Sequence, residues 1–236
     1  DPSLLLIAGL ISAVAATVHG TVGFGYGLLA VPTCALLHPD LAPSPQILVA
    51  VPLALIMVLR EGRFADRREI GLLILGGGPG ALLGIALVKV ASERGVQLTM
   101  AATILLGVVL MASGRRVPRT PRTIVGTGVA SGAMMLIGSI GGPPVALLYR
   151  DATGPTLRGT LALYFLIGDV VAIGLRWGTG EMGWPDVVAA LWLLPGLLLG
   201  LWLARFLIPR VEGEPLRRAV LALATGAALM LAWRAW

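Results

Sequence analysis

The chain repeats a pattern of glycines, prolines and basic residues at a nearly constant interval, and this repetition constrains the fold more than any other feature. Four features of the first half return 116 positions later: Arg60 as Arg176, Pro79-Gly80 as Pro195-Gly196, Gly84 as Gly200, and Lys89 as Arg205. Two Gly-rich clusters, at 23–27 and 138–142, align at an interval one residue shorter. Duplicated units with an interrupted apolar segment are typical of secondary transporters, in which the interruption lies at the substrate site. The repetition therefore predicts two copies of one membrane unit.

The composition places these units in a lipid bilayer. Hydrophobic residues make up 57% of the 236 residues and charged residues only 13%, with a mean hydropathy of +0.90, whereas soluble domains carry about a quarter charged residues. Charges, glycines and prolines bound the apolar segments, which cover 3–37, 44–59, 70–91, 97–113, 123–149, 157–175, 184–208 and 216–234. We predict an all-α polytopic membrane protein, because most of these segments approach or exceed the roughly 18 residues that cross a bilayer as a helix.

The first and fifth segments are too long for one simple crossing. Segment 3–37 would extend about 50 Å as a helix, against a hydrocarbon core of about 30 Å, and a glycine cluster interrupts it. A helix, a break and a second helix that enter and leave on one face would explain both properties. With both long segments re-entrant, 14 basic residues fall on one face and 4 on the other, a bias that the positive-inside rule favours.

This topology leaves three crossings in each half, so the two halves face in opposite directions. The predicted architecture is therefore two inverted repeats of four helical segments, each opened by a broken re-entrant hairpin. The first repeat covers 1–114, a basic cytoplasmic linker covers 115–122, and the second repeat covers 123–236. Both termini are then expected outside.

The glycine clusters supply the candidate substrate site. A broken helix frees backbone N–H groups and exposes a helix N-terminus with partial positive charge, and two such ends together would form an anion pocket. The predicted substrate-binding residues are Gly23, Phe24, Gly25, Tyr26, Gly27, Gly138, Ser139, Gly141 and Gly142. Pro143 and Pro144 have no N–H and are expected to fix the second turn instead. The alternative is that the small residues serve only close helix packing.

Four ionisable residues have candidate roles beside these clusters. Asp169 lies inside the apolar run 161–175, where a carboxylate is costly, so a proton-coupling role is weighed against a structural hydrogen bond. His19 shortly precedes the first cluster and could relay protons or contact substrate, or it could be a packed, hydrogen-bonded histidine. Arg60 and Arg176 end equivalent helices at opposite faces and could gate or attract an anion, whereas interfacial snorkelling is the alternative.

Other functions find less support in the sequence. No Gly-x-x-x-x-Gly-Lys-Ser/Thr motif indicates ATP hydrolysis, and two histidines with the single Cys34 supply no metal cluster, so we expect no cofactor and no metal. The net charge of +6 favours contact with anionic lipid over nucleic acid, and no oligomer is indicated. A passive anion channel, a transporter of another solute, and a membrane hydrolase using Ser139 and His19 stay as alternatives.

Two short motifs resemble a known family. The stretch from Thr21 to Pro32 resembles the opening motif of the TauE/SafE sulfite-exporter family, and the stretch from Gly138 to Pro144 looks like that family's second-half motif. The resemblance extends over the whole chain, with two four-segment halves and a basic central linker. It implies export of sulfite or of an organosulfonate such as sulfoacetate across a bacterial inner membrane. The glycines that carry over do so as motif positions only: Gly23, Gly25, Gly27, Gly138, Gly141 and Gly142.

We therefore expect a secondary transporter, and not an enzyme, that exports a small sulfur-containing oxyanion by alternating access. Its small anionic substrate would bind between the two hairpin tips, held by backbone N–H groups and Ser139. Proton coupling through Asp169 is a subsidiary hypothesis.

Overall fold

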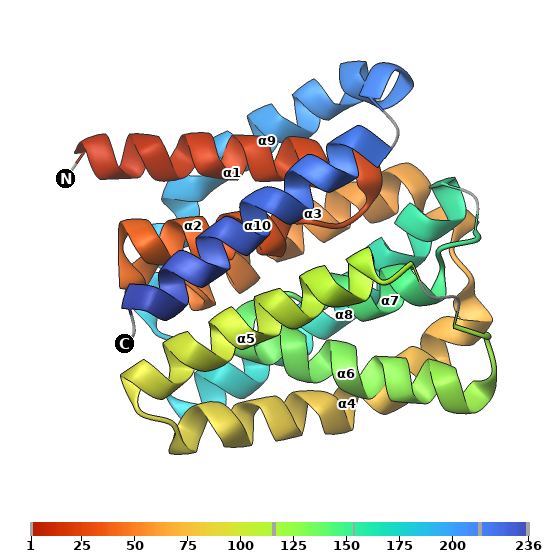
Figure 1. Ribbon diagram of the computed structural model, residues 1–236, viewed down its shortest axis with the longest axis horizontal. Helices are drawn as coiled ribbons and strands as arrows, with labels where there is room; N and C mark the ends of the chain where they lie inside the picture. Colours follow the sequence, from red (N-terminus) through yellow and green to blue (C-terminus); the bar gives the residue numbers. More distant parts are fainter. Residues whose placement is uncertain (1, 115–116, 153, 212–213, 235–236) are drawn as a thin grey trace.

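The protein is built from helices, as the computed structural model shows for residues 2–114, 117–152, 154–211 and 214–234 (Figure 1). The first half contains α1 (Pro2–Val22), α2 (Tyr26–Leu37), α3 (Ser44–Glu61), α4 (Arg67–Val90) and α5 (Glu93–Ala112). The second half contains α6 (Pro121–Gly138), α7 (Gly142–Leu148), α8 (Gly154–Thr179), α9 (Trp184–Val211) and α10 (Glu214–Arg234). Short 3-10 turns cover Pro39–Leu41 and Gly62–Phe64. These described residues contain no strand, and the all-α prediction is confirmed.

Six helices of the described chain are long and apolar enough to cross a membrane. These candidate spans are Ser3–Val22, Pro39–Phe64, Arg67–Val90, Arg94–Ala112, Gly154–Thr179 and Trp184–Leu207, accompanied by two shorter apolar helices, Tyr26–Leu37 and Val220–Arg234. Large apolar side chains also cover the outside, among them Val90 and Trp233, which are more than four-fifths exposed. Such an exterior is suited to lipid and not to water. The protein is thus a multi-pass membrane protein, although the division into three crossings per half stays a prediction.

Polar side chains cap the N-terminal ends of α4, α5 and α6. The Asp66 carboxylate accepts a hydrogen bond from the Glu69 amide at the start of α4, and the Ser92 hydroxyl accepts one from Gly95 at the start of α5. Thr120 and Thr123 bond to each other's backbone amides at the start of α6. These side chains satisfy amides that a helix start leaves without partners. The linker prediction for 115–122 lies partly outside the described residues, because these exclude 115 and 116.

The two long apolar segments are each broken into two helices, as the glycines predicted. The first break follows Val22, with Gly23 and Gly25 at φ of 94° and 108°. The second follows Gly138, where Ser139 adopts a φ of 55°. Ser139 is the one non-glycine residue with positive φ among the described residues, and this region is unfavourable for a side chain.

The structure corrects the alignment of the two breaks. Gly23 and Ser139 both have positive φ, and Tyr26 and Gly142 both begin the returning helix. Both pairs are separated by 116 positions, the interval of the downstream features, so the cluster interval one residue shorter was wrong. The sequence comparison had matched glycine with glycine, whereas the backbone matches Gly23 with a serine.

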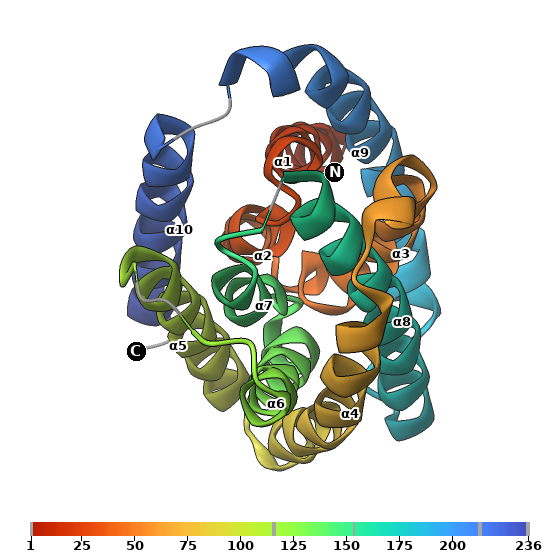
Figure 2. The ribbon, with the colours of Figure 1, turned by 90° about the vertical axis from the view of Figure 1, so that its right-hand side faces the viewer.

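Helix contacts come in matching pairs between the halves. α1 packs along α9 as α6 packs along α4, and α3 contacts α9 as α8 contacts α4. α3 also packs against α8, and α5 against α10, across the two halves. In Figure 2 the short helices α2 and α7 lie near the centre, and the longer helices surround them. This pairing supports a duplicated unit.

Chain direction relative to a membrane is the part of the topology that stays a prediction. Figure 1 shows both chain ends at one end of the molecule, while the described residues that join α5 to α6 lie at the opposite end. The arrangement agrees with termini on one side and the linker on the other. The inverted relation of the repeats and the assignment of each end to a side of the membrane are not tested by it.

Some of the repeated glycines serve close helix packing. A Cβ atom added to Gly80 on α4 would lie 2.1 Å from the carbonyl oxygen of Val129 on α6, and one added to Gly196 on α9 would lie 2.0 Å from that of Gly9 on α1. Backbones approach this closely only where one residue has no side chain. The packing alternative therefore explains these glycines, which lie outside the two breaks.

Replacing Gly80 with alanine should lower the stability of the folded protein by about 1–3 kcal/mol, because the new methyl group forces α4 away from α6. The measurement is the apparent unfolding temperature in detergent. Gly78→Ala is the matched control, since nothing lies within 4 Å of a Cβ atom at this neighbouring position. An equal effect of both substitutions would contradict the packing explanation.

Candidate functional site

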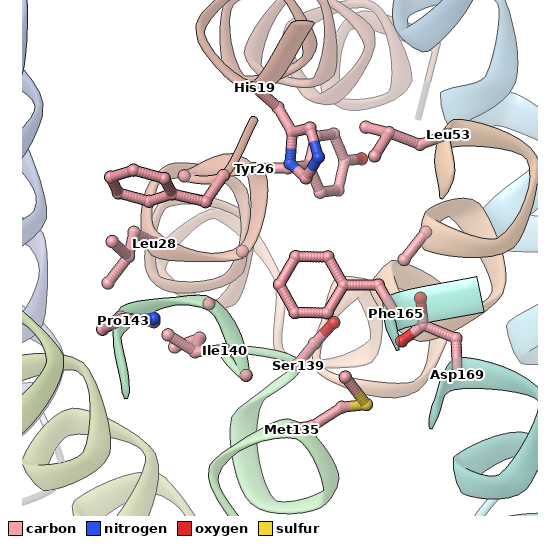
Figure 3. Close-up of a pocket in the computed structure, with 16 residues that line it drawn as sticks. His19, Tyr26, Leu28, Leu53, Met135, Ser139, Ile140, Pro143, Phe165 and Asp169 are labelled. Atoms are coloured by element: carbon pink, nitrogen blue, oxygen red, sulfur yellow. The ribbon is translucent and has the colours of Figure 1, made fainter. Parts of the chain in front are cut away.

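The two breaks meet in one internal pocket (Figure 3). The pocket encloses about 40 Å³, counted as the space open to the centre of a water molecule. Nine of the predicted site residues line it: His19, Phe24, Gly25, Tyr26, Gly27, Ser139, Gly141, Gly142 and Asp169. Four do not: Gly23, Gly138, Arg60 and Arg176. The sequence analysis did not place Leu28, Ala50, Leu53, Met135, Ile140, Pro143 and Phe165 in the lining.

Direct contact between the two breaks creates this pocket. A Cβ atom added to Gly27 would lie 2.1 Å from the carbonyl oxygen of Ser139, and one added to Gly142 would lie 3.2 Å from the Cβ of Phe24. The first turn of α2 therefore rests on the backbone of the second break. The Ser131 hydroxyl donates a hydrogen bond of 2.5 Å to the Gly141 carbonyl and holds that break in place.

The lining repeats with the same interval as the fold. Six pairs of lining residues are 116 positions apart: His19 with Met135, Phe24 with Ile140, Gly25 with Gly141, Tyr26 with Gly142, Gly27 with Pro143, and Leu53 with Asp169. Two of these pairs combine an ionisable residue with an apolar one. The first half consequently contributes a histidine to the pocket and the second half an aspartate, from different positions in the repeated unit.

His19 is a buried polar group without a protein partner. Its side chain is 5% exposed, and neither ring nitrogen has a hydrogen-bond partner in the structure. The His19 ring neighbours the Phe165 ring, with centroids 6.3 Å apart and the ring planes tilted by 59°. Buried polar atoms are nearly always paired, so these nitrogens are available to a ligand in the pocket. The expectation of a hydrogen-bonded packing histidine is not met.

Asp169 approaches the same space from α8. Figure 3 shows its carboxylate and the His19 imidazole on different sides of the Phe165 ring, with the Ser139 hydroxyl beneath that ring. Asp169 is 3% exposed, and no salt bridge of this carboxylate forms within the described part of the chain. An ionisable group buried in this way is a functional candidate.

The N-terminus of α2 adds backbone donors. Leu29 is the first residue whose amide bonds within the helix, at 3.2 Å from the Gly25 carbonyl, so the amides of Tyr26, Gly27 and Leu28 have no intrahelical acceptor. All three residues line the pocket beside His19. Helix starts of this kind carry partial positive charge and are suited to anions.

The second break supplies fewer backbone N–H donors to the pocket than the sequence analysis expected, since that analysis treated the two helix ends as equal. α7 has only seven residues, and Pro143 and Pro144 occupy its first turn without an N–H. Its residues shape the pocket wall and do not form a second helix dipole of comparable strength.

Tyr26 shapes the pocket with its ring and not with its hydroxyl. The Tyr26 and Ser12 hydroxyls are hydrogen-bonded at 3.1 Å, and Ser12 donates another bond to the Leu193 carbonyl on α9. The phenol thus ties α2 to α1 and α9. Tyr26, predicted as a substrate-binding residue, is among the lining residues of the pocket.

Arg60 and Arg176 make equivalent contacts outside the pocket. Arg60 donates to the Gly20 carbonyl at 3.0 Å, and Arg176 donates twice to the Leu136 carbonyl, at 3.2 and 2.6 Å. Gly20 and Leu136 lie in the last turns of the broken helices α1 and α6, again 116 positions apart. Arg176 is 2% exposed, so the snorkelling alternative does not describe it.

Sequence reasoning missed the partners of Arg60. Glu61 accepts from Arg60 at 3.1 Å and from Arg158 at 2.6 Å, and Arg158 also donates to the Thr21 carbonyl. Glu61 and Arg158 are 97 positions apart and both nearly buried. Neither stood out, because each lies at the edge of an apolar run where charged residues are ordinary.

A serine hydrolase would need a base bonded to its nucleophile. Neither nitrogen of His19 has a partner, so no hydrogen bond joins it to Ser139. The arrangement instead defines a multi-pass membrane protein with two broken helices around a small, mostly apolar pocket.

The comparisons with known proteins agree with this class. The family model described as "Sulfite exporter TauE/SafE" matches residues 8–231. The chain belongs to this family, which is a family of membrane transporters and not of enzymes. No curated protein and no solved structure matches the chain.

Proposed function

We propose that the protein is a secondary transporter that exports a small sulfur-containing oxyanion, sulfite or an organosulfonate such as sulfoacetate. The observation that carries the proposal is the unpartnered His19 in one buried pocket with the first three residues of α2, whose amides have no acceptor within the helix. An imidazole N–H and three amide N–H groups are donors suited to several oxygens on one anion. The family match supports the same class of substrate.

The size of the pocket favours a compact anion. A water molecule needs about 10–15 Å³ of such space, so 40 Å³ accommodates about three water-sized groups. Sulfite, with one sulfur and three oxygens, is close to this size. Sulfoacetate has a second acidic group and would need Phe165 or Leu53 to move aside. We therefore rank sulfite first.

Asp169 gives the transporter a means of proton coupling. An anion and an ionised carboxylate in one small, poorly solvated pocket repel each other. A proton on Asp169 removes that repulsion, so a proton would bind and leave together with the anion. Alternating access would then rock the helices around the site, exposing it to each side in turn.

Asp169→Asn should abolish the response of sulfite flux to a pH gradient while sulfite still binds, because asparagine mimics the permanently protonated acid. Sulfite flux is measured in proteoliposomes with an imposed pH gradient. We expect it to fall by about tenfold or more, toward the rate measured without a gradient. The exposed Asp40→Asn is the matched control. Undiminished gradient-driven flux in the Asp169 variant would remove the coupling role.

The substrate is tested first by binding to the purified protein. A ligand that binds only the folded state raises the apparent unfolding temperature, so sulfite, sulfoacetate, taurine, sulfate and acetate are compared by thermal shift and then by calorimetry. Selective stabilisation by sulfite or a sulfonate is the expected result. Stabilisation by acetate alone would indicate a different organic anion, and flux that never runs against a gradient would indicate a passive channel.

The proposed location is a bacterial inner membrane, with residues 115–122 in the cytoplasm and both termini outside. Single cysteines added at position 118 or before residue 2, in a Cys34→Ala background, test this orientation with a membrane-impermeant thiol reagent. The reagent should label the terminal cysteine in intact cells and the linker cysteine only after lysis.

A further inference from the structure

Arg60 and Arg176 lie outside the pocket lining but close enough for their positive charges to affect an ion bound in the pocket. We propose that these two arginines set the charge selectivity of the pocket, because each neutralises the carbonyl end of a broken helix that terminates there. The inference rests on the proposed function, since it explains how a pocket without a lysine or arginine in its lining binds an anion.

The broken helices would otherwise oppose anion binding. The last carbonyls of a helix have no internal partner, and together they carry the equivalent of about half a negative charge. α1 and α6 both end at the pocket, since His19 and Met135 in their last turns line it. Without compensation, two negative helix ends would face the positive end of α2 across a small space.

Both arginines bind these carbonyls directly. Arg60 bonds to Gly20 and Arg176 to Leu136, one residue after His19 and Met135 respectively. The Arg176 guanidinium also donates to the Ser44 hydroxyl, and no carboxylate lies within ion-pairing distance of it among the described residues. In direct contact its charge therefore meets carbonyl and hydroxyl oxygens, while the Glu181 and Asp186 carboxylates act on it from beyond ion-pairing distance.

The distance to the pocket is similar in the two halves. Arg60 follows the lining residue Leu53 by seven positions on α3, and Arg176 follows Asp169 by seven on α8. Seven residues of helix span about 10 Å. At that separation two unit charges in a partly buried setting change a binding constant by about tenfold.

Glu61 allows the electrostatic role to be separated from a structural one. Its carboxylate lies between Arg60 and Arg158 and reduces their positive potential at the end of α1. Removing this negative charge should strengthen anion binding, although it weakens the local contacts. A purely structural role predicts that every substitution in this network weakens binding.

The experiment compares sulfite binding by calorimetry in the full-length protein and in four variants. Arg60→Gln and Arg176→Gln should each raise the Kd about tenfold, Arg176→Lys should restore most of the affinity, and Glu61→Gln should lower the Kd several-fold. The exposed Arg68→Gln on α4 is the control and should bind as the unsubstituted protein does. Chloride and sulfate serve as further probes, so that the order of the variants is read with three anions.

The outcomes separate this inference from the proposed function. If the unsubstituted protein binds none of these anions, both are overturned. If it binds sulfite and the two glutamine variants bind equally well, only the selectivity role is overturned. Weaker sulfite binding in Glu61→Gln also overturns the selectivity role, because only an electrostatic role predicts tighter binding in this variant. The Glu61 variant therefore tests the inference even where an arginine variant does not fold.

Discussion

Replacing Gly27 with alanine should abolish oxyanion binding, with a loss of about 100-fold or more. The new Cβ would lie 2.1 Å from the Ser139 carbonyl oxygen, so the two breaks must separate by about 1 Å before they can coexist. Misplacement on this scale costs about two orders of magnitude at a site that depends on fixed geometry. The donors on α2 would then no longer converge with those near Ser139, and calorimetry with sulfite measures the change.

Gly126→Ala is the matched control for this prediction. It introduces the same methyl group on α6, where nothing lies within 4 Å of the added atom. Circular dichroism and the elution volume in detergent establish that both variants are folded. Sulfite affinity unchanged in a folded Gly27 variant would show that contact between the hairpin tips is not needed for the pocket.

Arg158→Met should lower the stability of the folded protein far more than the substitution of an exposed arginine does. The Arg158 Nε and the Glu61 carboxylate are 2.6 Å apart, with both side chains about nine-tenths buried. Removing one member of a buried pair leaves the other without compensation and costs about 3–5 kcal/mol. We expect a value near 3 kcal/mol, because Arg60 still contacts Glu61.

The test is detergent-mediated unfolding followed by circular dichroism. Arg68→Met provides the comparison, since it removes an exposed arginine from the nearby start of α4 and should change stability by less than about 0.5 kcal/mol. Equal losses in the two variants would mean that the ion pair adds nothing beyond surface charge.

Much of the fold could be predicted because its determinants are local. Clusters of glycine and proline interrupt helices, so the two breaks near Gly25 and Gly141 could be predicted from the positions of the glycine clusters. The membrane class followed equally directly from uninterrupted apolar length. The exact pairing of the breaks was missed, because Ser139 occupies a backbone conformation that a sequence reader assigns to glycine.

The site was predicted in part, for a physical reason that concerns distance along the chain. His19 lies more than a hundred residues before Ser139 and Asp169. The repeat interval of 116 indicated that their segments occupy equivalent places in the two halves. What no interval could indicate is whether His19 would find a hydrogen-bond partner or whether Arg60 and Arg176 would turn toward carbonyl oxygens. Those outcomes depend on packing between helices that have no sequence relation to one another.

The matched pocket positions bear on how a repeated protein acquires a directional site. Two identical copies arranged about an axis would offer a ligand two histidines or two methionines, and two leucines or two aspartates. In this chain the position equivalent to His19 is Met135, and the position equivalent to Asp169 is Leu53; all four residues line the pocket. Within one polypeptide the two copies can differ, so an ion bound as we propose would meet a donor from one copy and an acid from the other, and the two copies would not be interchangeable.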